Sequence, residues 1–138
     1  MDHLPFCILQ DRGSEGFDLH GGRISADGSE LGRFEPDLAY SCINGSIYNP
    51  LLACSVQLVD HDAGDGGFVI IPGSHKANFP APADVLTGTS SDVDLVRQPV
   101  TQAGDVVLFS ESSIHGAAAW MSEKQRRIAL YRSSCHLL

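Results

Sequence analysis

Long apolar runs, paired cysteines and a secretion signal are all missing from this sequence, and each absence argues against one class of protein. No apolar stretch approaches the roughly 18 residues that cross a bilayer, and the first residues, Met1 to Phe6, lack the basic region of a signal peptide. The four cysteines form no Cys-x-x-Cys pair, which disfavours a zinc site or a disulfide framework. We therefore expect a cytoplasmic protein with buried free thiols that does not enter the membrane.

Positive charge is also scarce. The chain has 9 Lys and Arg against 17 Asp and Glu, a net charge of -8, and the acids are spread along its length. Because such a surface repels a phosphate backbone, we expect no nucleic-acid partner. With 138 residues, 43% of them hydrophobic, the chain can bury a modest core, and we expect a single domain over residues 1–138.

Helical periodicity is almost absent, and short runs of Val, Ile, Leu and Phe alternate with clusters of Gly, Pro, Asp and Ser. This pattern predicts an all-β fold. The clearest strands are predicted over residues 51–59, 68–71, 93–100, 105–109 and 128–131, with weaker ones at 5–9 and 39–43. Glycine-rich segments at 64–67 and 103–105 are typical of tight hairpin connections. Strands at this spacing predict a sandwich or jelly roll.

Two histidines differ from the others in their setting. His20 and His115 each lie at the edge of an apolar segment and are followed by glycine, which lets backbone or a ligand approach closely. They are candidate metal ligands, with a hydrogen-bonded core histidine as the alternative. His61 lies in an acidic turn, and we expect it to be hydrated there, with a cation ligand as the alternative. His75 follows Pro-Gly-Ser, and we expect a structural role in which its ring bonds to the loop backbone.

Arg126 and Arg127 must point to opposite faces of a strand, because side chains alternate along it. The one that faces the interior needs an anion, since an unpaired buried guanidinium is unfavourable. A small dicarboxylate is a natural candidate. Tyr48 and Gln57 are polar residues beside or within apolar runs, and we expect them to face the interior as supporting contacts to such a ligand.

Four segments in this order resemble the phytanoyl-CoA dioxygenase-like members of the iron(II)- and 2-oxoglutarate-dependent oxygenases. They are Gly66-Gly67-Phe68-Val69-Ile70-Ile71-Pro72-Gly73-Ser74-His75-Lys76, then Ala103-Gly104-Asp105-Val106-Val107-Leu108-Phe109, then Ile114-His115-Gly116, then Arg126. The resemblance implies a double-stranded β-helix, a cupin-like jelly roll, that hydroxylates a small organic substrate with iron(II) and 2-oxoglutarate as cofactors. It also implies that His20 and His115 hold the iron and that Arg126 holds the far carboxylate of 2-oxoglutarate.

One expected ligand is missing from its place. The family carries aspartate two residues after the first histidine, where this chain has Gly22. Glu111, Asp18 and Asp27 are candidates for the missing carboxylate. In an extended chain, however, Glu111 would lie about 13 Å from His115 and Asp18 about 7 Å from His20, too far without a bend. Two alternatives are an iron halogenase, with a halide in the space that Gly22 leaves, and a jelly-roll binding module without catalytic activity.

The chain also differs from the family at its N-terminus, because only nineteen residues precede His20. The helical portion that usually covers one sheet is thus expected to be missing. Either the sequence is an N-terminally truncated piece, or another subunit covers the exposed sheet, since large apolar faces are seldom left in water. We therefore expect a tendency to self-associate.

Overall fold

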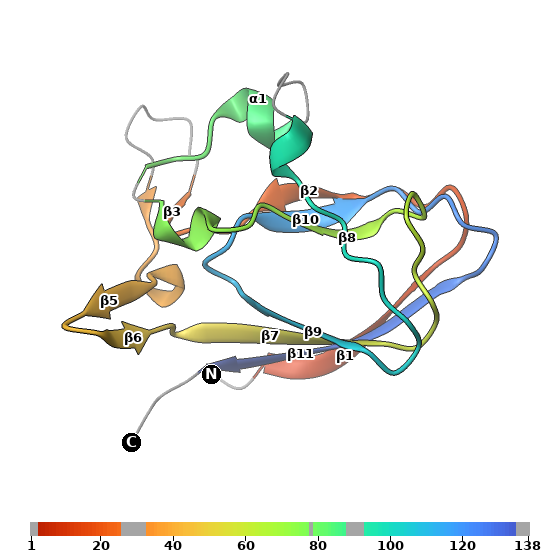
Figure 1. Ribbon diagram of the computed structural model, residues 1–138, viewed down its shortest axis with the longest axis horizontal. Helices are drawn as coiled ribbons and strands as arrows, with labels where there is room; N and C mark the ends of the chain where they lie inside the picture. The colour runs from red at the N-terminus through yellow and green to blue at the C-terminus, as the bar shows by residue number, and fades with distance from the viewer. Residues whose placement is uncertain (1–2, 26–32, 78, 88–92, 135–138) are drawn as a thin grey trace.

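Two antiparallel β-sheets face each other and form the body of the protein (Figure 1). The computed structural model describes residues 3–25, 33–77, 79–87 and 93–134. One sheet has the order β1 (His3–Gln10), β11 (Arg126–Ser134), β7 (Leu51–Gln57) and β9 (Val106–Ser110). The other has the order β2 (Phe17–His20), β10 (His115–Ala118) and β8 (Gly67–Ile70). The predicted all-β jelly roll is confirmed.

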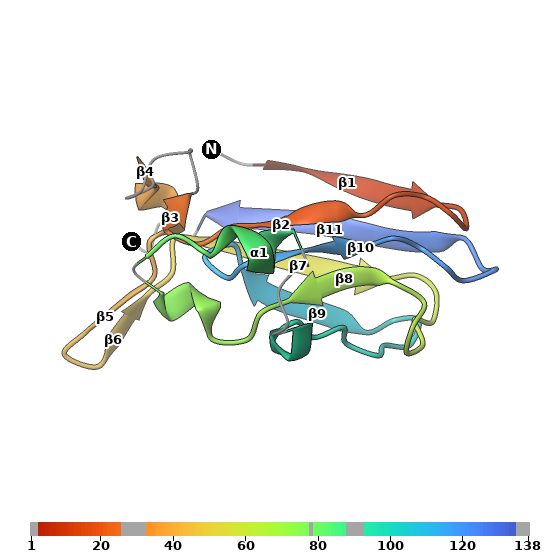
Figure 2. The same ribbon diagram turned by 90° about the horizontal axis from the view of Figure 1, so that it is seen from above.

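Smaller elements lie around the two sheets. The strands β3 (Ile24–Ser25) and β4 (Arg33–Phe34) form one pair, and β5 (Ser41–Ile43) and β6 (Ser46–Tyr48) form a hairpin that projects from one end (Figure 2). The short helices are η1 (Pro36–Leu38), η2 (Ser74–Lys76), α1 (Ala83–Leu86) and η3 (Val93–Leu95). Within the described residues, none of the helices is long and apolar enough to span a membrane.

The strands predicted from apolar runs mostly exist, but one does not. Residues 93–100 contain the short helix η3 and a single bridge from Arg97 to Ile70 in place of a strand. The turn at 64–67 connects β7 to β8, which belong to opposite sheets, so the predicted hairpin there is wrong. The segment at 103–105 is likewise a turn, closed by the backbone N–H of Asp105 donating to Gln102 at 3.0 Å, and not a hairpin.

The core lies between the sheets and follows the alternation along the strands. On β11, Arg126, Ile128 and Leu130 are buried, whereas Arg127 and Tyr131 are exposed. Leu130 packs with two other buried residues, Ala53 of β7 and Phe109 of β9, and a rim of partly buried residues surrounds them: Phe68, Ile70 and Val107. The interior arginine that the sequence required is therefore Arg126.

Truncation of Leu130 tests this assignment of the two faces. We expect Leu130→Ala to lower the free energy of unfolding by about 2–5 kcal/mol, because it removes buried apolar contacts and leaves a cavity. The matched control is Leu108→Ala on β9, where the side chain is 66% exposed and the change should have little effect. Urea denaturation of both variants measures the difference. Equal losses would contradict the assignment.

Candidate metal centre

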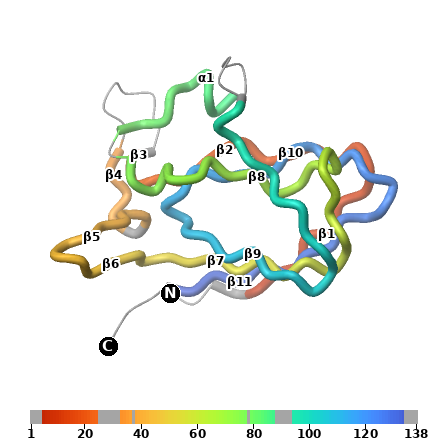
Figure 3. Tube along the Cα trace, viewed as in Figure 1, coloured from red at the N-terminus to blue at the C-terminus, as the bar shows by residue number. Residues whose placement is uncertain are grey.

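His20 and His115 come together because the strands that carry them are neighbours. In the antiparallel pair β2–β10, His20 lies directly opposite His115, and the two ring centroids are 4.5 Å apart. Figure 3 shows these two segments, from opposite halves of the sequence, side by side. His115 is buried, whereas His20 is exposed. The structure thus brings together the two histidines that the sequence singled out.

Both imidazole rings are fixed in the same way. Nδ1 of His115 lies 2.7 Å from the backbone oxygen of Ser113, and Nδ1 of His20 lies 2.8 Å from that of Asp18. A carbonyl oxygen only accepts, so in each ring Nδ1 donates its hydrogen and Nε2 of the neutral ring keeps a lone pair. Metal-binding histidines are usually oriented by such a hydrogen bond from the other ring nitrogen. Asp18 contributes its backbone oxygen to this arrangement.

The segment after His20 passes very close to the turn before His115. Gly21 has φ +100, and a Cβ there would lie 2.4 Å from the backbone oxygen of Ser113 and 2.9 Å from that of Glu111. Gly22 has φ +82 and is buried. Because L side chains rarely adopt these angles, an aspartate at position 22 would be strained. The backbone conformation at position 22 therefore disfavours the aspartate that the family usually has there.

The chain turns between Glu111 and His115, so the distance given for an extended segment does not apply. The strand β9 ends at Ser110, and the backbone N–H of Ser113 donates to the backbone oxygen of Ser110 at 2.9 Å. The turn brings Oε2 of Glu111 to 3.4 Å from Nε2 of His115, and both side chains are buried. Asp27, another candidate for the missing carboxylate, lies outside the described residues.

Arg126 is 2% exposed and lacks a full set of hydrogen-bond partners. Its Nη1 donates to Oε1 of Gln10 at 2.5 Å, while its Nε has no partner among the described residues. Burial lowers the pKa of Arg126 to about 10, so the side chain remains charged at neutral pH. A buried cation with a free donor is suited to bind an anion.

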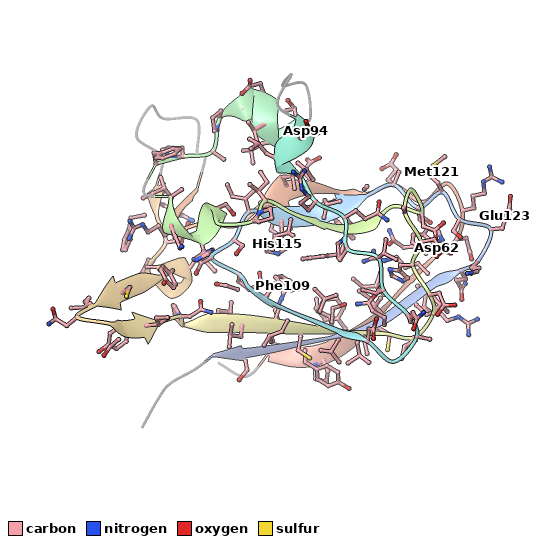
Figure 4. All side chains as sticks on the ribbon, in the orientation of Figure 1. Asp62, Asp94, Phe109, His115, Met121 and Glu123 are labelled. Atoms are coloured by element: carbon pink, nitrogen blue, oxygen red, sulfur yellow. The ribbon has the colours of Figure 1, made fainter. Side chains whose placement is uncertain are left out.

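The two histidines and Arg126 line one cavity of about 260 Å³ between the sheets. Its walls are largely apolar and include Phe17, Phe68 and Phe109, and Arg132 adds a second guanidinium. The ring of Phe109 lies 4.8 Å from that of His115, and Figure 4 shows both residues in the space between the sheets. A pocket with apolar walls and few convergent polar groups is typical of a site for a small molecule.

The two residues expected to support the cofactor do not reach this cavity. Tyr48 is 54% exposed on the projecting hairpin, so the expectation that it faces the interior is wrong. Gln57 is buried as expected, but its Nε2 donates to the backbone oxygen of Ser55 at 3.0 Å and to Oγ of Ser55 at 2.9 Å. Ser55 lines the cavity and Gln57 does not, so Gln57 contacts the cavity wall through its hydrogen bonds to Ser55.

The other two histidines examined in the sequence pack against aromatic rings. His61 was expected in a hydrated turn but is 3% exposed, with its ring 5.0 Å from that of Trp120. Burial and, to a smaller extent, the charge of Arg126 lower the pKa of His61 below its usual value. His75 packs edge-on against Tyr40 at 4.7 Å. A structural role therefore fits both.

Sequence analysis missed two residues that shape the site. Arg132 lies on the same face of β11 as Arg126, six residues further on, and its Nε donates to Oε1 of Glu111 at 2.9 Å. Strand alternation could have identified it. The hydroxyl of Ser74 accepts from the backbone N–H of Ile114 at 2.7 Å and donates to the backbone oxygen of Ile71, so it ties the Pro-Gly-Ser-His loop to the segment before His115.

The two facing imidazoles supply two of the three ligands of the 2-His-1-carboxylate set that is typical of non-haem iron oxygenases. The chain belongs to the phytanoyl-CoA dioxygenase family, since residues 33–128 match the model of that family. The match includes His115 and Arg126 but begins after His20 and Gly22. Among curated protein sequences, none matches this chain significantly.

Solved structures of similar proteins cover nearly the whole chain. HygX from Streptomyces hygroscopicus with nickel and 2-oxoglutarate is 25% identical, with a TM-score of 0.79, over 100% of this chain and 57% of that one. HygX with iron is 24% identical to this chain, with a TM-score of 0.77. The match covers 97% of this chain and 57% of the HygX chain. EctD from S. alaskensis with 2-oxoglutarate and 5-hydroxyectoine shares the fold. It is 17% identical, with a TM-score of 0.64, and the match covers 96% of this chain and 43% of the EctD chain.

These comparisons agree with the cofactors expected from the sequence, iron(II) and 2-oxoglutarate, which are those of the family. The residues present fit both groups, because two imidazoles keep free Nε2 lone pairs and the buried arginine keeps a free donor. The chain spans just over half the length of the HygX chains.

The buried histidines predict how stability depends on pH. Burial lowers the pKa values of His61 and His115 in the folded protein, although in His115 the hydrogen bond to Ser113 and the charge of Glu111 oppose the effect. As the pH falls below the ordinary histidine pKa of 6.5, the unfolded chain therefore binds more protons than the folded protein does. The free energy of unfolding should consequently fall as the pH falls.

Chemical denaturation of the metal-free protein at pH 7.5, 6.5 and 5.5 measures this dependence. We expect His61→Phe, which keeps a ring beside Trp120 but removes the titrating group, to show a shallower loss of stability than the original protein. Identical pH profiles for the two proteins would show that His61 does not contribute.

Proposed function

We propose that this protein is an iron(II)- and 2-oxoglutarate-dependent oxygenase that hydroxylates a small organic substrate in the cytoplasm. The observation that carries the proposal is that His20, His115 and Arg126, from three separate strands, line one cavity. Membership of the phytanoyl-CoA dioxygenase family and the likeness to HygX support it. Cys7, Cys42 and Cys54 are free, which is consistent with a reducing compartment, although the expectation that they are buried is wrong, since Cys7 and Cys42 are exposed and Cys54 is partly buried.

In this proposal, Nε2 of His20 and Nε2 of His115 bind iron, and Arg126 binds the far carboxylate of 2-oxoglutarate. Iron(II) with 2-oxoglutarate supplies the oxidation of a substrate C–H bond by dioxygen. The protein orients both imidazoles through their Nδ1 hydrogen bonds and offers the unpartnered Nε of Arg126 to the carboxylate. Phe68 and Phe109, together with the more exposed Phe17, provide apolar contact for a carbon skeleton.

A small-molecule substrate fits both the cavity and the similar proteins. At about 260 Å³ the cavity is slightly smaller than the usual range for small-molecule sites, about 300–1,000 Å³. One HygX structure contains hygromycin B together with nickel and 2-oxoglutarate. His20 is both exposed and part of the cavity wall, so a substrate larger than the cavity would extend into solvent beside it.

The halogenase remains a second candidate because of one observation, Gly22 in place of the acidic residue. Chloride or bromide would then occupy the position beside iron that a carboxylate normally fills. Glu111, which lies close to His115, competes with this interpretation. The two candidates differ in the response of the metal centre to halide.

Anaerobic spectroscopy tests the centre directly. We expect iron(II) and 2-oxoglutarate together to give a weak visible charge-transfer band that His115→Ala abolishes. Arg126→Met should raise the 2-oxoglutarate concentration needed for the band by about tenfold or more, because it removes a charged hydrogen bond. The matched control is Arg127→Met on the outer face, which should leave the band unchanged.

Three outcomes would contradict parts of this assignment. No band at millimolar 2-oxoglutarate would favour a binding module without catalytic activity. A band that shifts with chloride or bromide would favour the halogenase. Equal effects of the Arg126 and Arg127 substitutions would place the carboxylate elsewhere.

We also propose that the protein self-associates through the outer face of its four-stranded sheet. Side chains directly opposite each other on paired strands share a face. The register therefore gathers a largely apolar outer face, defined as Cys7, Leu9, Cys54, Val56, Val106, Leu108, Ala129 and Tyr131, and exposed Arg127, opposite Leu9, is a charged residue on the same face. Leu9 and Leu108 are more than 60% exposed. An apolar surface of this extent is typical of a contact with another chain.

Sedimentation velocity at micromolar concentration tests this second proposal. We expect species larger than the monomer, and we expect Leu108→Lys to shift the distribution toward the monomer by placing a charge on the apolar outer face. Leu95→Lys, at an exposed leucine in η3, is the matched control and should have no effect. A monomer at every concentration would disprove the association.

A further inference from the structure

A carboxylate lies beside the second histidine, although the position that normally supplies it holds glycine. The Glu111 side chain is 8% exposed, and Figure 4 shows His115, its neighbour, between the sheets. Oε1 of Glu111 accepts a hydrogen bond from Nε of Arg132 at 2.9 Å. Oε2 is directed toward His115, 3.4 Å from Nε2 of that ring. The two oxygens of Glu111 thus face two different groups.

The separation between Glu111 and His115 is that of two ligand atoms that bind the same metal ion. Nδ1 of His115 donates to Ser113, so in the neutral ring Nε2 directs a lone pair toward Oε2, which also carries lone pairs. Two donor atoms that are each about 2.1 Å from one metal ion are about 3.0 Å apart at a right angle and about 3.4 Å apart at the tetrahedral angle. The observed separation falls in this range. A cation between the two atoms would remove their mutual repulsion.

The backbone around Gly22 points to the same residue. At φ +82, position 22 is strained for any residue with a side chain, so aspartate there is disfavoured by the path of the chain itself. The same path brings Gly21 so close to the turn that a Cβ would lie 2.9 Å from the backbone oxygen of Glu111. His20, the residue before Gly21, is therefore close to the turn that carries Glu111.

A simpler interpretation is that Glu111 serves only as a partner for Arg132. That pair involves Oε1 and accounts for one of the two oxygens, whereas Oε2 faces Nε2 of His115, with which it forms an ion pair only when that ring is protonated. Two roles fit the two oxygens better: Arg132 holds Oε1 and fixes the carboxylate, and Oε2 is available to a metal. A hydrogen bond of this kind to a ligating carboxylate is common in metal sites.

We propose that Glu111 is the acidic metal ligand of this protein and completes a set with His20 and His115, with Arg132 as its positioning residue. The proposal rests on the metal centre proposed above. Within the described residues, no three His, Cys, Asp or Glu side chains already converge on one point. The metal therefore draws the set together, and the exposed His20 is the side chain with room to move.

Cobalt(II) is a suitable probe, because its visible absorption reports the ligands directly without turnover. We expect Glu111→Gln, which keeps the shape but removes the charge, to raise the Kd for cobalt(II) by at least about tenfold. The matched control is Glu123→Gln, at an exposed glutamate, which should leave the Kd unchanged. Circular dichroism and thermal unfolding of each variant confirm that it is folded.

A rescue experiment separates ligation from a merely structural role. Formate should restore cobalt(II) affinity and the visible bands to Glu111→Ala, since it replaces the missing carboxylate, but should have no effect on His115→Ala. Arg132→Met should weaken binding by less than Glu111→Gln, because it loosens the ligand without removing it. Gly22→Asp in the Glu111→Gln background should not restore binding, given the φ angle at that position.

The results distinguish failure of this inference from failure of the proposed function. If His115→Ala abolishes cobalt(II) binding while Glu111→Gln leaves the Kd within twofold, the metal centre stands and Glu111 is not its ligand. Rescue of Glu111→Gln by Gly22→Asp would also overturn the inference. If the unaltered protein binds no cobalt(II), then the metal centre and its proposed acidic ligand are both disproved.

Discussion

The close approach of two backbone segments is the constraint on which the site depends. A Cβ on Gly21 would collide with the backbone oxygen of Ser113, so only glycine allows the end of β2 to lie against the turn that leads into β10. The same contact fixes the register in which His20 is opposite His115. Because the two imidazoles come from strands nearly a hundred residues apart, their meeting depends on this long-range pairing, which Gly21 permits.

Strand alternation and the burial of apolar runs account for what could be predicted from the sequence. The runs in β7, β8, β9 and β11 were found because several of their residues are apolar and β-branched. Alternation also required one interior arginine, which is Arg126. The strand β10, with the sequence His115-Gly-Ala-Ala, carries no such signal, and it forms because two neighbouring strands pair with it. Residues 93–100 have the apolar signal but lack the strand.

The turn before His115 shows why the position of Glu111 could not be obtained from spacing along a strand. Three serines stand between residues 110 and 113, and they form the turn with their own groups: Oγ of Ser110 accepts from the backbone N–H of Ser112, and the backbone oxygen of Ser110 accepts from Ser113. Serine commonly ends a strand in this way. An extended chain was thus the wrong reference, and the serines were the available indication of a bend.

The two arginines of β11 that line the cavity explain why a carboxylate belongs beside it. Arg126 and Arg132 both line it, and a metal ion would add further positive charge in a largely apolar space. Such a space favours compensation by nearby anions, because isolated charges are strongly disfavoured away from water. Glu111 compensates Arg132, and Arg126 is left with a free donor for an anion that enters from outside. An anion that binds Arg126 should therefore also stabilise the fold, since the folded state alone presents this site.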